Sequence, residues 1–147
     1  MNDDPVTLAR ILLRECLRAS LATTLEDGAP YASLVLVAAA EDGAPLLLLS
    51  DLAQHTLNLS RDPRAALLFD GTAGVKDPLD GARLTLLGEV ERWDNEADRF
   101  LERHPSARTY VGFKDFHFYR MIPTRAHLVA GFGRIHWLEG SALLGNG

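Results

Sequence analysis

Short apolar runs separated by Asp-Gly pairs constrain the fold of this chain more than any other feature. Asp27-Gly28 and Asp42-Gly43 each lie between stretches rich in apolar and β-branched residues, at positions 21–25, 31–39 and 46–49. Asp-Gly is a preferred sequence for the tight turn of a β-hairpin, and such stretches are typical of strands. The pattern therefore predicts an antiparallel meander in the N-terminal half.

Short strands also account for most of the C-terminal half. We predict them at residues 65–69, 84–90, 116–122 and 126–129, with Pro123 separating the last two. The Gly- and Asp-rich residues 71–81 are predicted to form a long loop.

Three helices are predicted, at residues 5–18, 52–60 and 94–104. Asp4, Ser50 or Asp51, and Asp94 are the expected N-caps. Six or seven strands with three helices, without βαβ alternation, indicate a mainly β fold with peripheral helices. We expect a closed or nearly closed antiparallel barrel.

The length of 147 residues suits one domain, and the sequence contains neither a linker nor an internal repeat. Residues 1–147 are therefore predicted to form a single domain. Its last nine positions, 139–147, are small and glycine-rich, and we predict that they form a disordered tail.

Composition excludes several classes of function. The net charge is −5 and the basic residues form no run, so we expect no binding to nucleic acid. The apolar runs are too short to span a bilayer, and acidic residues near the start do not suit a secretory leader. Cys16 is the single cysteine, which excludes an internal disulfide. Together these features predict a cytoplasmic protein without a membrane partner.

The sequence contains no motif for zinc binding or nucleophilic catalysis. There is neither an HExxH pattern nor a pair of cysteines among the five histidines and one cysteine, so no metal site is predicted. No Gly-x-Ser-x-Gly sequence occurs either, and the catalytic residues stay unknown. A single histidine as axial ligand of a haem remains open.

One segment has the features of a ligand site. An apolar strand ends at Ser50, and the first turn of the next helix offers Gln54, His55 and Thr56, while Ser33 interrupts the preceding strand. Backbone amides at a helix start, together with hydroxyls and an imidazole, suit a phosphate group. Ordinary capping by the same side chains explains the segment equally well.

Several motifs in order make the chain similar to a known family. They are residues 30–35 (PYASLV), 48–59 (LLSDLAQHTLNL), 62–69 (DPRAALLF), 119–128 (YRMIPTRAHL) and 131–137 (GFGRIHW). In these motifs the chain resembles the pyridoxamine 5′-phosphate oxidase-like family of FMN-binding split barrels. It is most similar to the haem-utilisation branch, which includes HugZ-type haem oxygenases.

The resemblance implies a six-stranded antiparallel split barrel that forms a homodimer, with FMN at the interface. It also implies a flavin-dependent oxidoreductase that acts on a small-molecule substrate of unknown identity. Matched position by position, the cofactor-binding residues would be Tyr31, Ala32, Ser33, Leu34, Ser50, Gln54, His55 and Thr56.

Departures from the family pattern leave alternatives open. Gln54-His55 stands where pyridoxamine-phosphate oxidases have Arg-Lys, which removes fixed positive charge and disfavours vitamin B6 oxidation. Haem and the deazaflavin F420 are alternative cofactors, and a non-catalytic flavin-binding module is an alternative function. The candidates for contact with substrate or haem are Arg134, His136, His127 and His117.

Overall fold

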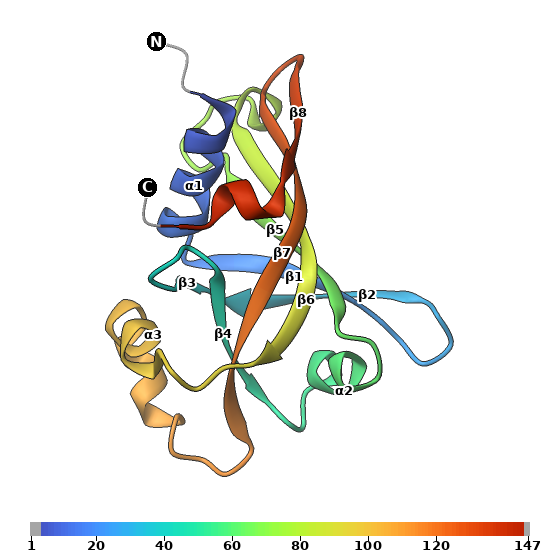
Figure 1. Cartoon of the computed structure of the whole chain (residues 1–147), viewed down its shortest axis with the longest axis vertical. Coiled ribbons are helices and arrows are strands. Elements are labelled where there is room, and N and C mark those ends of the chain that lie inside the picture. Colours follow the sequence, from blue (N-terminus) through green and yellow to red (C-terminus); the bar gives the residue numbers. More distant parts are fainter. Residues whose placement is uncertain (1–3, 146–147) are drawn as a thin grey trace.

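The computed structural model describes residues 4–145, which form a curled antiparallel sheet with three α-helices (Figure 1). The mainly β fold predicted from the sequence is confirmed. The helices are α1 (Pro5–Glu15), α2 (Gln54–Arg61) and α3 (Ala97–Arg103), with short 3₁₀ turns at η1 (Pro78–Asp80), η2 (Pro105–Thr109) and η3 (Gly140–Leu143). The strands are β1 (Arg18–Thr24), β2 (Pro30–Leu36), β3 (Ala38–Ala39), β4 (Pro45–Ser50), β5 (Arg64–Gly71), β6 (Ala82–Arg92), β7 (Phe116–Gly131) and β8 (Arg134–Glu139).

Both Asp-Gly turns close hairpins, as the sequence predicts. One hairpin joins β1 to β2 and the other joins β3 to β4. The predicted continuous meander is wrong, because the sheet order is β2-β1-β5-β6-β7-β4-β3, with β8 paired to β7. The two hairpins therefore lie at opposite ends of the sheet. The sheet curls so that β2 comes into contact with β4, and the barrel is split between these two strands.

The inner face of the sheet forms the core. One row of paired residues runs across β1, β5, β6 and β7, points inward and is fully buried. It consists of Leu21, Leu67, Leu86 and Ala126. α1 covers this face with Ala9, Leu12 and Leu13. Its predicted cap is confirmed, since the Thr7 amide donates to Asp4 Oδ2 at 3.2 Å.

Two predicted helices differ in extent from the structure. α1 ends at Glu15 rather than at residue 18, because Arg18 already pairs with Leu36 in the β1–β2 ladder. α3 begins at Ala97 after Glu96, which makes no side-chain cap, so the predicted cap at Asp94 is wrong. Asp94 instead forms an exposed ion pair with Arg92 at 3.4 Å.

β7 is one continuous strand, and the predicted break at Pro123 is wrong. Pro123 has no amide hydrogen to donate, but it lies opposite Gly88, where the β6–β7 register shifts. A Cβ at Gly88 would lie 2.3 Å from the backbone oxygen of Ile122. Because Gly88 has no side chain, β6 and β7 can approach closely here, and their pairing continues on both sides of Pro123. β8, which was not predicted, returns after a turn at Gly133 with φ +78°.

The predicted disordered tail is also wrong for the described residues. η3 packs against the core, where Leu143 is buried. The Arg10 guanidinium donates to the Ala142 carbonyl at 2.9 Å, and the Gly145 amide donates to the Asp42 carbonyl at 2.9 Å. These contacts fix the segment beside α1 (Figure 1). Residues 146–147 lie outside the described part of the chain.

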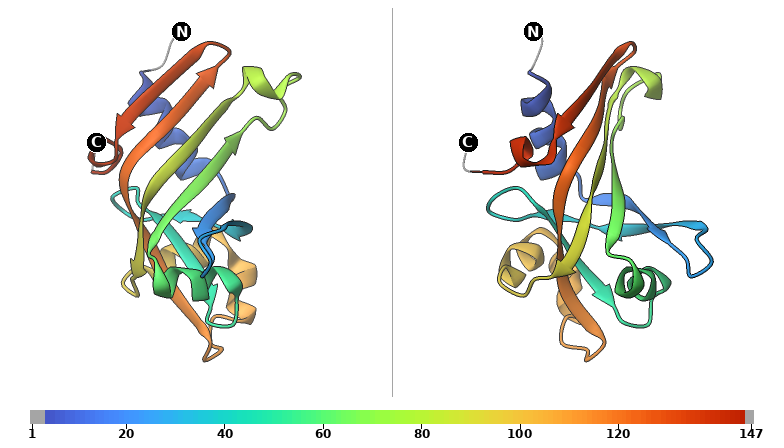
Figure 2. Two further views of the ribbon diagram at one scale, coloured as in Figure 1. Left: turned by 90° about the vertical axis from the view of Figure 1, so that its right-hand side faces the viewer. Right: turned by 45° about the vertical axis from the view of Figure 1, so that its right-hand side comes forward.

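The outer face of the sheet exposes a second row of paired side chains. Leu34, Ser20, Leu68, Thr85, His127 and Trp137 follow one another across six strands. α1 and α2 both pack on the inner face. The outer row is therefore not covered by these helices, and at its two ends Leu34 is 70% exposed and Trp137 is 59% exposed. Figure 2 shows the long β5–β8 ribbon that carries part of this outer face.

No helix within residues 4–145 has the length and apolar character needed to cross a membrane. The cytoplasmic location expected from the sequence stays a prediction.

Candidate functional site

A cavity of about 280 Å³ lies at the split between β2 and β4. It is open to solvent and is bordered by the start of α2 on one side and by α3, the residue after η2 and the start of β7 on the other. Its lining is mostly apolar and aromatic, with Leu34, Val35, Leu36, Leu48, Leu49, Ser50, Ala53, His55, Phe100, Tyr110 and Phe116. A site of this size is at the lower end of the range for cofactor pockets, so a large ligand would extend beyond its rim.

His55 is the imidazole that lines this cavity, and Ser33 fixes its ring. Ser33 Oγ and His55 Nδ1 are 3.1 Å apart, which links β2 to α2 across the edge of the cavity. Ser33 pairs with Leu21 and therefore points inward, toward the helix. Burial lowers the pKa of His55 below its ordinary value of 6.5, which favours the neutral ring.

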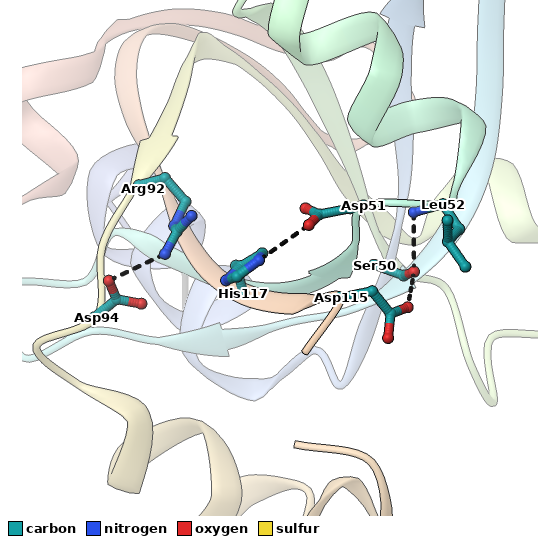
Figure 3. Close-up of polar contacts among 7 residues, drawn as sticks. All are labelled: Ser50, Asp51, Leu52, Arg92, Asp94, Asp115 and His117. Atoms are coloured by element: carbon teal, nitrogen blue, oxygen red, sulfur yellow. Dashed lines mark hydrogen bonds and ion pairs between the residues drawn. The ribbon is translucent and has the colours of Figure 1, made fainter. Parts of the chain in front are cut away.

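Ser50 lies at the end of β4 and is held by a carboxylate (Figure 3). Its hydroxyl donates to Asp115 Oδ2 at 2.6 Å and accepts from the Leu52 amide at 3.1 Å. The Asp51 amide donates to the Asp115 carbonyl at 2.6 Å, which ties the same turn to the start of β7. The predicted phosphate ligand Ser50 thus uses its proton within the protein.

The start of α2 borders the cavity through Ala53 and His55. Its N-cap is Ala53, which has no side-chain cap, so the expected capping by Ser50 or Asp51 is wrong. Both predicted caps come too early, because Ser50 Oγ accepts from Leu52 and Asp51 bonds to His117. The first amides of a helix have no acceptor within the helix and form a favourable site for an anion.

Gln54 and Thr56, which were also predicted to bind the cofactor, do not line the cavity. Gln54 turns away from the cavity and donates to Asn58 at 2.8 Å, in a network that continues to Thr23. Thr56 is buried, and its hydroxyl has no hydrogen-bond partner within residues 4–145.

On β2, alternate residues face opposite sides of the sheet. Tyr31 is half-buried on the side of Ser33, while Ala32 and Leu34 are exposed on the other side. Of the predicted residues, Ser50 and His55 line the cavity and Ser33 contacts His55. Leu34 also borders the cavity, from the edge strand β2, although its side chain is on the outer face.

The predicted haem or substrate residues lie elsewhere. His117 Nε2 bonds Asp51 Oδ2 at 3.0 Å beside the Ser50 turn (Figure 3). His127 packs on Trp137 at 4.6 Å between ring centroids, on the outer face. His136 pairs with Leu128 and so points to the opposite face. Arg134 donates to the Ala130 carbonyl at 2.9 Å.

Sequence reasoning missed the aromatic wall of the cavity and Asp115. The wall consists of Phe100 on α3, Tyr110 directly after η2 and Phe116 at the start of β7. All three lie at least 50 positions after Ser50 in the sequence. Aromatic residues recur between positions 110 and 119, and this density was the available signal. The tight packing of Tyr110 on Phe116, with 4.8 Å between ring centroids, gives the wall its shape.

The split antiparallel barrel with a cavity at its strand–helix junction defines the class of the pyridoxamine 5′-phosphate oxidase-like split barrels, and the resemblance stated from the sequence is confirmed. The chain belongs to the CREG β-barrel family, whose model matches residues 2–143. It is 35% identical over 152 residues to the non-canonical haem oxygenase HOZ, chloroplastic, of Arabidopsis thaliana. That match covers 97% of this chain but 43% of the plant protein.

Two solved structures have a fold similar to that of this chain. A haem-binding protein from Mycobacterium smegmatis superposes with a TM-score of 0.91 at 31% identity, covering 97% of this chain and 61% of that one. A protein of the pyridoxinephosphate oxidase family from Clostridium acetobutylicum has a TM-score of 0.70 at 14% identity, covering 97% and 99%. The second likeness shows the fold alone. The chain spans less than two thirds of the length of both the plant protein and the mycobacterial protein.

Proposed function

We propose that the chain binds haem in the cavity between β2 and β4. The observation that carries this proposal is the chemistry of the cavity wall, where apolar and aromatic side chains surround one imidazole. Such a wall suits a flat, largely apolar macrocycle, and a neutral imidazole is a common ligand of haem iron. No Arg or Lys lines the cavity within the described residues, which suits a flavin phosphate less well.

Relatives support the proposal from outside the structure. The plant protein is named a haem oxygenase and the mycobacterial protein a haem-binding protein, each more than 30% identical to this chain. Because each is longer than this chain, haem degradation here is a proposal in its own right.

The residues present fit haem as follows. Leu48, Tyr110 and Phe116 would offer apolar contacts to the ring, and the uncapped start of α2 would offer amide donors to its acidic side groups. When bound, haem supplies an iron centre that binds and reduces dioxygen. The protein's own contribution would be to orient the ring, exclude water from its buried edge and hold His55 neutral.

Titration of the purified protein with haemin tests the proposal. We expect a saturable Soret band and a higher melting temperature with haemin than without it. Addition of ascorbate in air then tests degradation through decay of the Soret band and growth of bilin absorbance. Absence of a saturable band and of any melting shift would contradict haem binding.

FMN is the second candidate, and F420 is its close chemical variant. Two features favour FMN, which are the start of α2 and the Thr56 hydroxyl. This hydroxyl is buried without a partner in residues 4–145, and Thr56 directly follows the cavity residue His55. Both groups could serve a phosphate. Parallel titrations with FMN and F420, followed by anaerobic reduction with NADPH, test for a flavin-dependent oxidoreductase. Binding without reduction would instead favour the non-catalytic module.

The outer sheet face is the surface that would form a homodimer. Its row from Leu34 to Trp137 exposes Leu68, which is 42% accessible, at its centre. A second copy would cover these apolar side chains. We expect light scattering to give the mass of a dimer, and Leu68→Glu to give a monomer. Phe132→Glu, at the exposed tip of the β7–β8 hairpin, is the matched control and should leave the dimer intact. A monomeric wild-type protein would contradict the assembly.

A further inference from the structure

We propose that His55 is the residue that ligates the iron, through Nε2, and that Ser33 is the positioning residue of its ring. This inference rests on the proposed haem function and names a ligand that the sequence did not single out for haem. Three observations support it. They are the identity of the donor groups in the cavity wall, the hydrogen bond that anchors His55, and the positions of the other histidines outside the cavity.

The donor groups of the cavity wall leave few choices for an iron ligand. Ser50, His55 and Tyr110 are its residues with polar side chains. The Ser50 hydroxyl is engaged by Asp115 and Leu52. A phenol such as that of Tyr110 must lose its proton to ligate iron, whereas a neutral imidazole binds directly. His55 is therefore the best donor in the wall.

The anchoring of His55 leaves one ring nitrogen for a ligand. Nδ1 is 3.1 Å from Ser33 Oγ, while Nε2 makes no hydrogen bond to any residue from 4 to 145. With the proton on Nδ1, the ring donates to Ser33 and Nε2 presents its lone pair. A second hydrogen bond of this kind fixes the tautomer and ring orientation of metal-binding histidines. The contact also joins α2 to β2, so the ring is held from two elements.

The remaining histidines are less suited to the cavity. His117 uses Nε2 to bond Asp51, and His127 packs against Trp137 on the outer face. His104 is buried with Nε2 2.7 Å from the Val37 carbonyl oxygen. His136 lies on β8, which does not contribute to the cavity wall.

Haemin titration of His55→Ala and of His136→Ala tests the assignment. We expect His136→Ala to keep the wild-type spectrum, because β8 does not contribute to the cavity wall and His136 lies outside the proposed dimer surface. His55→Ala should lose the histidine-ligated spectrum, and added imidazole should restore it by entering the space that the side chain leaves. If His55→Ala fails to fold by circular dichroism, His55→Gln takes its place in the same titration.

Ser33 provides the second arm of the experiment. Ser33→Ala should weaken haemin binding by about tenfold and alter the ligand-field bands, whereas Ser33→Thr, which keeps the hydroxyl, should restore both. A purely structural role of Ser33 would change the melting temperature without moving those bands.

The outcomes separate the two proposals. A wild-type protein that binds no haemin overturns the proposed function. A wild-type protein that binds haemin, together with a His55→Ala variant of unchanged spectrum, overturns the ligand assignment alone.

Discussion

Two regions of the molecule combine imidazole with aromatic rings, and they differ in shape. At the split, His55 lies with Phe100, Tyr110 and Phe116 around a cavity of about 280 Å³. At the β7–β8 end, His127 and Trp137 lie side by side on an open sheet face. At the split, the half-buried imidazole is anchored by Ser33 through Nδ1, and its Nε2 has no hydrogen bond to residues 4–145, whereas the β7–β8 end carries part of the face proposed for a second copy.

The comparison teaches that surroundings decide what a histidine can do. His117, His127 and His136 were candidates in the sequence because a single histidine suffices as axial ligand of a haem. His127 pairs with Trp137, and successive residues of a strand point to opposite faces, so His136 faces the other side of the sheet from His127. These histidines therefore do not share a site.

The largest expected effect comes from filling the cavity. Ala53 lies in its wall with extended backbone angles (φ −78°, ψ 145°) that tryptophan adopts without strain. Ala53→Trp would place an indole in the cavity, and we expect haemin affinity to fall by about 100-fold, or ~2.7 kcal/mol. Ile135→Trp, on the exposed β7–β8 end, is the matched control. Equal losses in the two variants would refute the distinction between the regions.

A second change disturbs the strand that joins the two regions. Gly88→Ala would push a Cβ to 2.3 Å from the Ile122 oxygen at the register shift opposite Pro123. We expect the free energy of unfolding to fall by about 1–3 kcal/mol in urea denaturation. Gly112→Ala has nothing within 4 Å of its new Cβ and should change stability by less than about 0.5 kcal/mol. An unaltered urea midpoint for Gly88→Ala would show that β6 and β7 approach less closely.

A third change tests why the split should prefer haem to a flavin phosphate. Asp115 places a carboxylate on Ser50 at the cavity wall (Figure 3). Asp115→Asn removes that charge, and we expect FMN affinity to rise by about threefold relative to haemin affinity. Asp94→Asn removes a charge from the exposed pair with Arg92 and serves as the control. If both variants give the wild-type ratio of affinities, the carboxylate does not select between the ligands.

The smallest effect is a dependence of stability on pH in the ligand-free protein. Burial holds the pKa of His55 below 6.5, so the unfolded chain takes up a proton more readily than the folded one. Stability should be unaffected by this residue above pH 6.5 and should decline as the pH falls below that value. His55→Gln should show a smaller decline between pH 7 and 5.5 in urea denaturation. An identical decline in both proteins would mean that His55 titrates normally.

Local chemistry in the sequence predicted part of the fold well. The Asp-Gly hairpins and the Asp4 cap depend on neighbouring residues, and both are present. The continuity of β7 was not predictable in this way, because the residue that accommodates Pro123 is Gly88 on another strand.

The site followed the same division. The strand–helix junction and the resemblance suggested Ser33, Ser50 and His55 as cofactor residues, and the structure brings these three residues to one cavity. Their roles depend on partners that only the fold brings near. Asp115 reaches Ser50 from 65 positions away, and Ser33 reaches His55 across the split. The sequence therefore supplied candidate residues, while the structure shows which of their polar groups already have hydrogen-bond partners.

The most direct test of the account is paramagnetic broadening of backbone amide resonances by bound ferric haem. The signals of His55, Ala53 and Ser50 should broaden, because these residues line the cavity. The amides of Ile135 and Trp137, and the indole N–H of Trp137, should remain sharp. Broadening at Ile135 and Trp137 with sharp signals from His55 would place haem on the β7–β8 end and contradict the account.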